Sequence, residues 1–400
     1  MLGPAIEFAS ATRVLKALFL LLVVLCAAIP AVAQPSLIVK VESGPTSALL
    51  NQELTCDPID IPDTPARALR LKNGSVQLYA TNRDNRVDSG PDLLHLEHRC
   101  PVVYRGRGEA DPAAYDDRAW IASLWTPDGQ TIWAVVHNEY HGELRPVLCP
   151  TRRYMDCWFN SLTLAVSHDG GAHYDRAPGN ALVATLPYRF DQLGLGHHGY
   201  FNPSNIVSFD GYHYMFAFAT GANAQKNGNC LLRTKAVGQA SAWNGWDGVA
   251  FSIKFINPYA GLAEPEEHVC APVRVGQLRW PVTSLVRHAP SGTFIALMQD
   301  TSPGGGVFYS TSADLLNWSK PYLLMPAVGL SNWLCGNPSP IVFPSILDPS
   351  SDDLNFETVS AHALLFATEF EVKDCKLASR RLVRWKITIQ PTQTVSDKHP

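Results

Sequence analysis

The sequence lacks a strong excess of either charge, since 32 Lys and Arg face 36 Asp and Glu in 400 residues and the formal net charge is -4. A nucleic-acid-binding protein needs a basic surface, so this class is excluded. The chain also lacks low-complexity segments, amphipathic helical periodicity of useful length and, after its N-terminal region, any apolar run near the ~20 residues that cross a bilayer. We therefore expect no nucleic-acid partner and no membrane attachment of the mature chain.

Turn-forming and aromatic residues are abundant, with 28 Gly, 30 Pro and 10 Trp in a chain that is 46% hydrophobic and 17% charged. The last two values are ordinary for a globular protein. Gly and Pro form tight turns, and aromatic side chains favour strands. The composition therefore predicts an all-β protein.

The N-terminus has the parts of a secretory signal peptide. Two basic residues precede an apolar run over residues 17–29, and the small-residue triplet 31–33 forms a cleavage site before Gln34. A membrane anchor is the alternative, but the run is shorter than a bilayer-spanning helix. We expect residues 1–33 to be removed and residues 34–400 to form one domain, secreted or periplasmic and monomeric.

The cysteines predict a disulfide framework. Cys26 lies in the signal, which leaves an even number in an exported chain. Neighbours in sequence are the favoured pairs, Cys149 with Cys157 first, although about 105 connectivities are formally open. A zinc site is less favoured because no CxxC spacing exists; we expect no cofactor, and a structural calcium ion stays open. The mature cysteines are Cys56, Cys100, Cys149, Cys157, Cys230, Cys270, Cys335 and Cys375.

The stretch 116–142 predicts a β-hairpin. Its two β-rich runs, residues 119–125 and 131–136, flank a Pro-Asp-Gly turn, in which Pro presets φ and Gly accepts a positive φ. An antiparallel hairpin brings its two open ends to one side. The polar residues expected at that edge are Asp116, Asp117, Arg118, His137, Asn138, Glu139 and His141.

The same pattern of strand, turn and strand recurs along the chain. Further hairpins are expected in residues 67–82, 206–219, 282–298 and 341–368. Antiparallel units that repeat every ~50–80 residues are typical of a β-propeller. The last unit lacks a fourth strand, and the strand at residues 36–42 could supply it. We predict a five-bladed β-propeller closed by this N-terminal strand; a β-sandwich with decorated loops is the alternative.

A propeller of this kind would gather polar residues in one funnel. The inner strand of each blade starts at the rim of the central channel, and the loop after the second strand opens at that rim. Carboxylates, Arg and His beside a Trp suit a sugar, whose hydroxyls need polar partners and whose ring stacks on an aromatic face. The candidate substrate-binding residues are Arg67, Arg83, Arg118, His137, His141, Asn202, Asn205, Trp280, Asp300 and Glu369.

Two turn motifs resemble those of known propeller glycosidases. Residues 167–174 (SHDGGAHY) resemble the Asp-box of sialidase-like propellers. Residues 312–318 (SADLLNW) resemble the Ser-x-Asp-Leu-x-x-Trp turn of five-bladed glycosidases of the arabinanase and xylosidase type. The resemblance covers most of the mature chain and implies a glycoside hydrolase acting on a poly- or oligosaccharide. The motifs lie away from the channel and leave the substrate open.

The resemblance also implies catalytic roles. In those glycosidases an Asp at the start of the first inner strand is base or nucleophile, an Asp on the next blade tunes the pKa, and a Glu is the general acid. Asp63 matches the first position and Asp117 the second. The third blade, which usually supplies the Glu, begins with residues 202–205 (NPSN) and has no carboxylate. We assign the acid to Glu139, with Glu264 as the second choice.

Some alternatives stay open at this stage. Arg67 and Arg118 either hold a substrate carboxylate, which would indicate an acidic sugar, or form salt bridges to nearby Asp residues. The two histidines of residues 137–141 are expected to form hydrogen bonds or transfer protons rather than bind zinc, because joint binding with the Glu between them would require a bend. The missing third-blade carboxylate keeps a second function open, a carbohydrate-binding or scaffold propeller without catalysis.

Overall fold

The computed structural model describes residues 37–47, 55–145, 147–179, 181–261, 264–330 and 333–392. These residues form strands and short 3₁₀ helices, and no α-helix occurs among them, so the predicted all-β class is confirmed. The predicted signal peptide lies outside the described residues. In the part of the chain that is described, no helix has the length and apolar character needed to cross a membrane.

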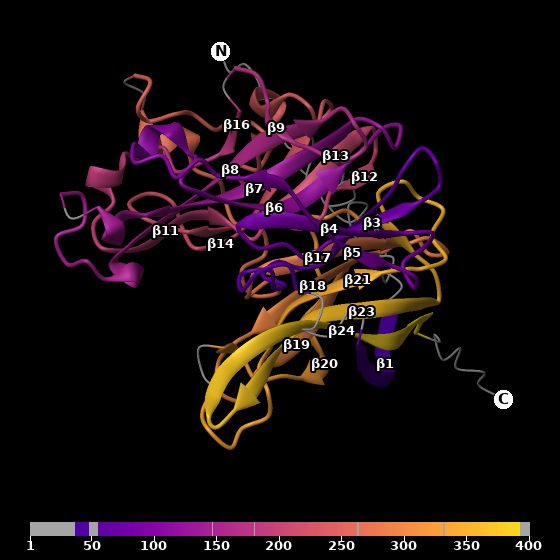
Figure 1. Ribbon diagram of the computed structural model, residues 1–400. Helices are drawn as coiled ribbons and strands as arrows, with labels where there is room; N and C mark the ends of the chain where they lie inside the picture. The colour runs from indigo at the N-terminus through magenta and orange to yellow at the C-terminus, as the bar shows by residue number, and fades with distance from the viewer. Residues whose placement is uncertain are drawn as a thin grey trace, which may run out of the picture. The chain divides into compact units, whose positions relative to one another are not determined.

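The strands form antiparallel groups that follow one another along the chain (Figure 1). The first group is β2 (Arg67–Arg70), β3 (Val76–Tyr79), β4 (Asp84–Gly90) and β5 (Glu97–Arg105). The second is β6 (Arg118–Trp125), β7 (Ile132–His141), β8 (Cys157–Ser167), β9 (Asp175–Arg176) and β10 (Leu182–Ala184). The third is β12 (Val207–Phe209), β13 (Tyr212–Thr220), β14 (Gly228–Thr234), β15 (Asn244–Gly245) and β16 (Ile253–Lys254).

The fourth group is β17 (Val282–His288), β18 (Phe294–Asp300), β19 (Gly306–Ser312) and β20 (Tyr322–Pro326), with β22 (Thr358–Val359) parallel to β17. The last group is β21 (Ile341–Leu347), β23 (His362–Lys373), β24 (Lys376–Pro391) and β1 (Leu37–Ser47). The 3₁₀ helices are η2 (Pro112–Ala114), η3 (Gly142–Leu144), η4 (Tyr154–Asp156), η5 (Phe190–Gln192), η6 (Ala240–Ala242) and η7 (Pro265–His268).

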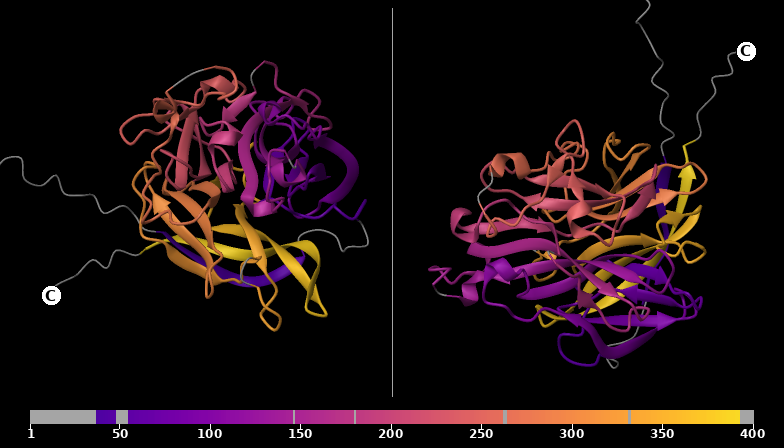
Figure 2. Two further views of the ribbon diagram at one scale, coloured as in Figure 1. Left: turned by 90° about the vertical axis from the view of Figure 1, so that its left-hand side faces the viewer. Right: turned by 90° about the horizontal axis from the view of Figure 1, so that it is seen from above.

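The first and last strands of the chain pair with each other. β1 runs antiparallel to β24, from Leu37 opposite Pro391 to Ser47 opposite Val383. Figure 2 shows this indigo strand lying against the yellow C-terminal strands. The pairing expected for the N-terminal strand is therefore present, and the strand is longer than the predicted residues 36–42.

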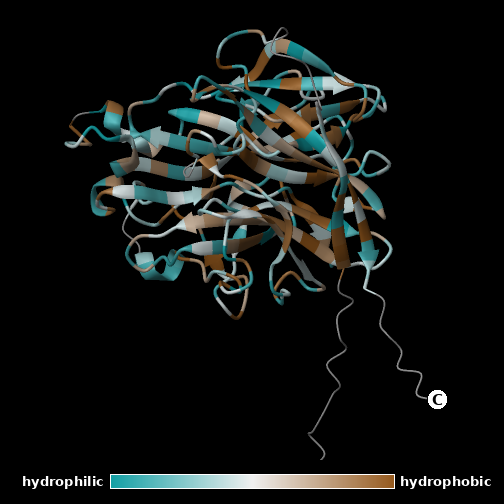
Figure 3. Ribbon diagram, turned by 90° about the horizontal axis from the view of Figure 1, so that it is seen from below, coloured by the Kyte–Doolittle hydropathy of each residue, from teal (hydrophilic) through white to brown (hydrophobic). Residues whose placement is uncertain are grey.

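The apolar core lies between adjacent groups of strands. Leu162 of β8 and Leu232 of β14 belong to one buried cluster. Val39 of β1, Leu297 of β18 and Leu365 of β23 belong to another. Hydrophobic and hydrophilic residues interleave along the strands (Figure 3), as expected where each strand turns one set of side chains towards a neighbouring sheet.

The two motif turns are closed by the same kinds of hydrogen bond, with spacings that differ by one residue. The Ser167 hydroxyl donates to Asp169, and the Asp169 carboxylate accepts backbone N–H groups from Ala172 and His173, both at 3.1 Å. In the second turn Asp314 accepts the N–H groups of residues 316 and 317 in the same way. Both turns close on their own backbone, so the motifs stabilise local structure.

All the mature cysteines form disulfides between neighbours in sequence. The pairs are Cys56–Cys100, Cys149–Cys157, Cys230–Cys270 and Cys335–Cys375. The predicted framework and its favoured pairing are confirmed.

Strand β7 is longer than the sequence pattern predicts. Residues 137–141 continue the strand, because β8 begins at Cys157 and pairs with β7 as far as His141 opposite Trp158. An unpredicted strand, β11 (Gly196–Phe201), lies parallel to this extension of β8 and antiparallel to β13. Polar residues remain in strand conformation here because backbone partners on both sides complete the ladder.

Candidate active site

A cavity of about 1110 Å³ opens where the antiparallel groups meet. Strands of the second, fourth and last groups and the segments before or between the strands of the first and third groups line it, and aromatic side chains and charged groups share the lining. Its charged and hydrogen-bonding side chains include Asp63, Asn82, Arg83, Arg118, Trp120, His137, Glu139, His141, Glu143, Asn202, Trp280, Gln299 and Arg380.

The extended part of β7 presents three of these residues on one face. His137, Glu139 and His141 all line the cavity, while Asn138 and Tyr140 lie on the other face. Successive strand residues alternate between faces, so residues 137, 139 and 141 share a face without any bend. The expectation that a bend would be needed to bring Glu139 beside the two histidines is therefore wrong.

His141 bridges two carboxylates. Its Nε2 lies 3.0 Å from Glu139 Oε2, and its Nδ1 lies 3.1 Å from Glu143 Oε1. The Tyr154 ring stacks on the imidazole at 5.2 Å between centroids. Because both imidazole nitrogens face carboxylates, this arrangement can pass a proton between Glu139 and Glu143.

The second carboxylate of the cavity, Asp63, is held by an arginine from the far end of the chain. Arg380 of β24 pairs with Asp63 Oδ1. Burial raises the pKa of Asp63 to about 6; Arg380 opposes the rise, and the negative charge of Glu139 adds to it. Asp63 is thus a stronger base than an ordinary carboxylate and still ionises near neutral pH.

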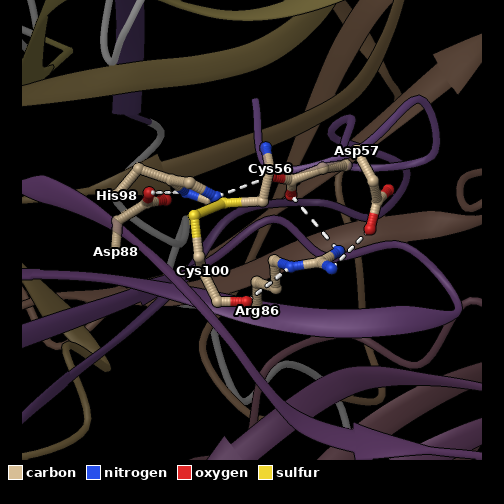
Figure 4. The surroundings of a disulfide bond; sticks show 7 residues. Cys56, Asp57, Arg86, Asp88, His98 and Cys100 are labelled. Carbon is tan, nitrogen blue, oxygen red and sulfur yellow. Dashed lines mark hydrogen bonds and ion pairs between the residues drawn. A yellow bond between two sulfur atoms is a disulfide. The ribbon is translucent and has the colours of Figure 1, made fainter. Parts of the chain in front are cut away.

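A polar network clamps the segment that leads to Asp63 (Figure 4). The Cys56–Cys100 disulfide joins it to β5, and Arg86 pairs with Asp57 at 2.5 Å. His98 contacts both Asp60 and Asp88 at 2.7 Å. The Asp63 N–H donates to the Thr81 carbonyl at 3.1 Å, so the backbone is fixed on either side of the carboxylate.

Three carboxyl groups of this network, Asp57, Asp60 and Asp88, face two cationic side chains, Arg86 and His98. Hydrogen bonds to Asp60 and Asp88 raise the pKa of His98 to about 9. Burial opposes ionisation of Asp60, but the same histidine lowers its pKa, whereas burial keeps the pKa of Asp88 raised. Among the described residues, Cys56, Asp60 and His98 are the group close enough to hold a metal ion, but Cys56 is bound in the disulfide and is no free thiolate.

Aromatic rings form one wall of the cavity. Tyr154 stacks on Trp158 at 4.8 Å, and Trp158 stacks on His197 at 3.9 Å between centroids. Phe201 continues the column beside His197 at 4.8 Å. Trp280 stands apart and stacks on Phe308. Such ring faces suit the C–H surface of a sugar.

Comparison with known proteins adds similar structures but no family. No family model matches the chain, and no curated protein matches it. Similar solved structures include an α-L-arabinanase of Cellvibrio cellulosa in complex with arabinohexaose, at 11% identity over 81% of this chain and 91% of that chain with a TM-score of 0.46.

Two more are a putative exo-β-1,3-galactanase of Bifidobacterium bifidum and an endo-1,4-β-xylanase of Bacteroides thetaiotaomicron. The first is 14% identical over 83% of this chain and 92% of that chain with a TM-score of 0.45. The second is 12% identical over 83% and 96%, also at 0.45. At identities of 11–14%, these likenesses concern the fold alone.

Asp117, expected beside the catalytic groups by this resemblance, does not line the cavity. Its carboxylate accepts hydrogen bonds from the Arg145 side chain and from the His141 backbone N–H, both at 3.0 Å. It lies beneath β7 and holds the backbone of His141 in place. Asp117 therefore affects the site through His141.

Arg67 also lies outside the cavity and binds no carboxylate. Its guanidinium donates to the carbonyl groups of Ala122, Pro203 and Thr283 at 3.0, 3.1 and 2.8 Å. Burial lowers the pKa of Arg67 to about 9. Arg67 therefore neither faces the cavity, where a substrate would bind, nor forms a salt bridge to Asp63 or Asp117. It joins the second, third and fourth groups of strands to the first.

Other candidates are engaged elsewhere. Asn205 forms hydrogen bonds with both backbone groups of Leu285. Asp300 accepts the Ser302 N–H at 2.9 Å. Glu369 pairs with Arg381 at 2.5 Å. Glu264 is exposed and precedes η7, outside the cavity lining. The remaining candidates, Arg83, Arg118, His137, Glu139, His141, Asn202 and Trp280, line the cavity.

Four residues of the cavity lining were not predicted from the sequence pattern: Trp120, Glu143, Trp158 and Arg380. Trp120 and Trp158 lie in strands, where an aromatic residue is ordinary. Arg380 belongs to an Arg-Arg pair that interrupts the apolar pattern of the last strand, which could have identified it. Its partner, however, is 317 residues away in the chain.

Proposed function

We propose that the protein is an exported glycoside hydrolase that cleaves a poly- or oligosaccharide with Asp63 and Glu139. One observation carries this proposal: two carboxyl groups, Asp63 in the segment before β2 and Glu139 on β7, face the same cavity. Glycoside hydrolysis requires two carboxyl groups on either side of the scissile bond.

The chemistry assigns opposite roles to the two groups. Arg380 keeps Asp63 ionised, so Asp63 attacks the anomeric carbon or removes a proton from water. Glu139 gives its proton to the leaving oxygen as the C–O bond breaks. If Asp63 has bonded to the anomeric carbon, a water oxygen then bonds to that carbon, the bond to Asp63 breaks, and the water proton goes to Glu139. If Asp63 instead acts as the base, the water proton goes to Asp63 and then to solvent, and Glu139 regains a proton from solvent through Glu143 and His141.

The fold that we propose is a five-bladed propeller closed by β1. Each antiparallel group is one blade, and β1 is the outer strand of the last blade. The pairing of β1 with β24 supports this closure. Four disulfides support export, because such bonds persist in oxidising compartments.

Hydrolysis of aryl glycosides tests the proposal. The panel holds furanosides, pyranosides and uronides in both anomeric forms, with wild type, Asp63→Asn, Glu139→Gln and the control Glu97→Gln. Glu97 is an exposed carboxylate of β5 that pairs with Arg99, outside the cavity lining. We expect the first two variants to lose at least about 100-fold in kcat/KM and the control to keep its activity. An active Asp63→Asn variant would contradict the assignment.

A carbohydrate-binding propeller without catalysis is the second candidate. The ion pair with Arg380 occupies Asp63 Oδ1, and Asp117 is turned away towards Arg145, which favours binding over cleavage. Titration calorimetry with oligosaccharides tests this candidate. Binding without turnover by the wild type, unchanged in Glu139→Gln, would support it.

A further inference from the structure

The charged groups of the cavity are not all paired. Asp63 pairs with Arg380, and both Glu139 and Glu143 contact His141. Two arginines remain that also line the cavity, Arg83 and Arg118. Their guanidinium groups make no hydrogen bond or ion pair with any described residue. Arg83 and Arg118 are therefore the arginines of the cavity that have no carboxylate partner among the described residues.

Two buried nitrogen atoms of the lining also lack partners. Trp120 and His137 are 7% and 6% exposed. The Trp120 indole N–H lies near Asp63 and lowers its pKa, but it makes no hydrogen bond of normal geometry within the described part of the chain. His137 Nε2 also has no partner there and is 4.0 Å from Glu139 Oε1. A buried donor without an acceptor is costly, and an indole N–H can only donate. A ligand that brings acceptor oxygens into the cavity would satisfy it.

The register of the β6–β7 hairpin places these groups together. Arg118 is opposite Glu139, and Trp120 is opposite His137. Residues two apart on a strand share a face, so all four lie on the cavity side of the hairpin. Arg83 comes from the neighbouring group, after β3, and approaches the same cavity. Arg118 therefore lies beside Glu139, the carboxyl group assigned as the acid, and Arg83 faces the same cavity.

We propose that the sugar unit recognised by this cavity carries an oxyanion, either a ring carboxylate or a sulfate ester. Arg83 and Arg118 bind the oxyanion, and the Trp120 indole donates to the same unit. The inference rests on the proposed function, since it names the substrate class of that site. The hydroxyl groups of a neutral sugar give the two guanidinium groups only uncharged acceptors, whereas a carboxylate or sulfate gives them charge-assisted hydrogen bonds.

Matched glycoside pairs test the inference. Aryl glucuronides and galacturonides are compared with the glucosides and galactosides that differ only at C6, and 6-sulfated galactosides form a third arm. The variants are Arg83→Met, Arg118→Met and Arg118→Lys, and the control is Arg99→Met, an exposed arginine of β5 outside the cavity lining. We expect each Met variant to lose about 10- to 100-fold in kcat/KM on the acidic substrate, mainly through KM, and less than about 3-fold on its neutral counterpart.

The outcomes separate the two proposals. Preference for an acidic arm that Arg118→Met abolishes and Arg118→Lys partly restores supports the inference, and the preferred arm identifies carboxylate or sulfate. Turnover of neutral glycosides at equal or higher rates overturns the inference and leaves the proposed function standing. If no glycoside is cleaved, the proposed function fails, and calorimetry with the same compounds then tests the inference by itself. Equal binding of acidic and neutral sugars, or binding of neither, overturns the inference as well.

Discussion

Replacing Arg380 with Met removes the guanidinium that contacts Asp63 in the cavity. Three effects then remain on Asp63: burial and the charge of Glu139 raise its pKa, and the Trp120 side chain lowers it by a smaller amount. An opposite charge at contact distance lowers a carboxyl pKa by about 1–3 units. The pKa of Asp63 should therefore rise from about 6 to ~7–9 in the variant.

This shift predicts a loss of activity that depends on pH. Asp63 acts in its ionised form, which is ~90% populated at pH 7 when its pKa is about 6. In Arg380→Met this fraction falls to ~50–1%, so kcat/KM at pH 7 should fall about 2- to 90-fold. The acidic limb of the pH profile should move up by the same number of units, and activity should recover at pH 9 to 10 if the fold tolerates it. Carbon-13 NMR titration of the Asp63 carboxyl measures the shift without turnover.

Arg381→Met is the matched control. Arg381 is the next residue on β24 and pairs with Glu369, outside the cavity lining. We expect its pH profile to match that of the wild type, and Arg380→Lys to give an acidic limb between those of wild type and Arg380→Met. An acidic limb that stays in place in Arg380→Met would refute the reasoning.

Three further predictions concern stability. His98 has a pKa of about 9, above its ordinary 6.5, so its charge stabilises the fold below pH 6.5 and this contribution is lost as the pH rises through 9. In urea unfolding, the His98→Gln variant should therefore be about 1–3 kcal/mol less stable than wild type at pH 6 and nearly as stable as wild type at pH 9.5. Equal losses of stability at the two pH values would contradict this. Ionised Asp63 destabilises the fold above its raised pKa of about 6. The Asp63→Asn variant should therefore have a free energy of unfolding about 1–3 kcal/mol higher than wild type at pH 8, and this difference should disappear at pH 4. A variant that is less stable than wild type at pH 8 would rule this out. The Arg67→Met variant leaves the carbonyl groups of Ala122, Pro203 and Thr283 without their donor. Its free energy of unfolding, measured in thermal melts, should fall by at least about 3 kcal/mol. A melting temperature within ~2 °C of wild type would show that Arg67 is not needed for stability.

Short-range physics determined much of this protein. The Pro-Asp-Gly turn at residues 127–129 and the alternation of flanking residues predicted the β6–β7 hairpin, because turn conformation and strand period depend on residues a few positions apart. The motif turns at Asp169 and Asp314 close on their own backbone, so their residues alone specify them. The disulfides join neighbours in sequence, which the even cysteine count and simple proximity predicted.

Long-range contacts decided the site. The pair of Asp63 with Arg380 crosses 317 residues, and the three carbonyl groups that bind Arg67 belong to three other groups of strands. Strand β7 continues through residues 137–141 only because β8 and β11 extend beside it. The local sequence pattern indicated Asp63 and Glu139, but it did not predict which arginines form structural hydrogen bonds and ion pairs and which are left to bind a ligand. That depends on burial and on partner strands distant in sequence, which exist only once the sheets have packed.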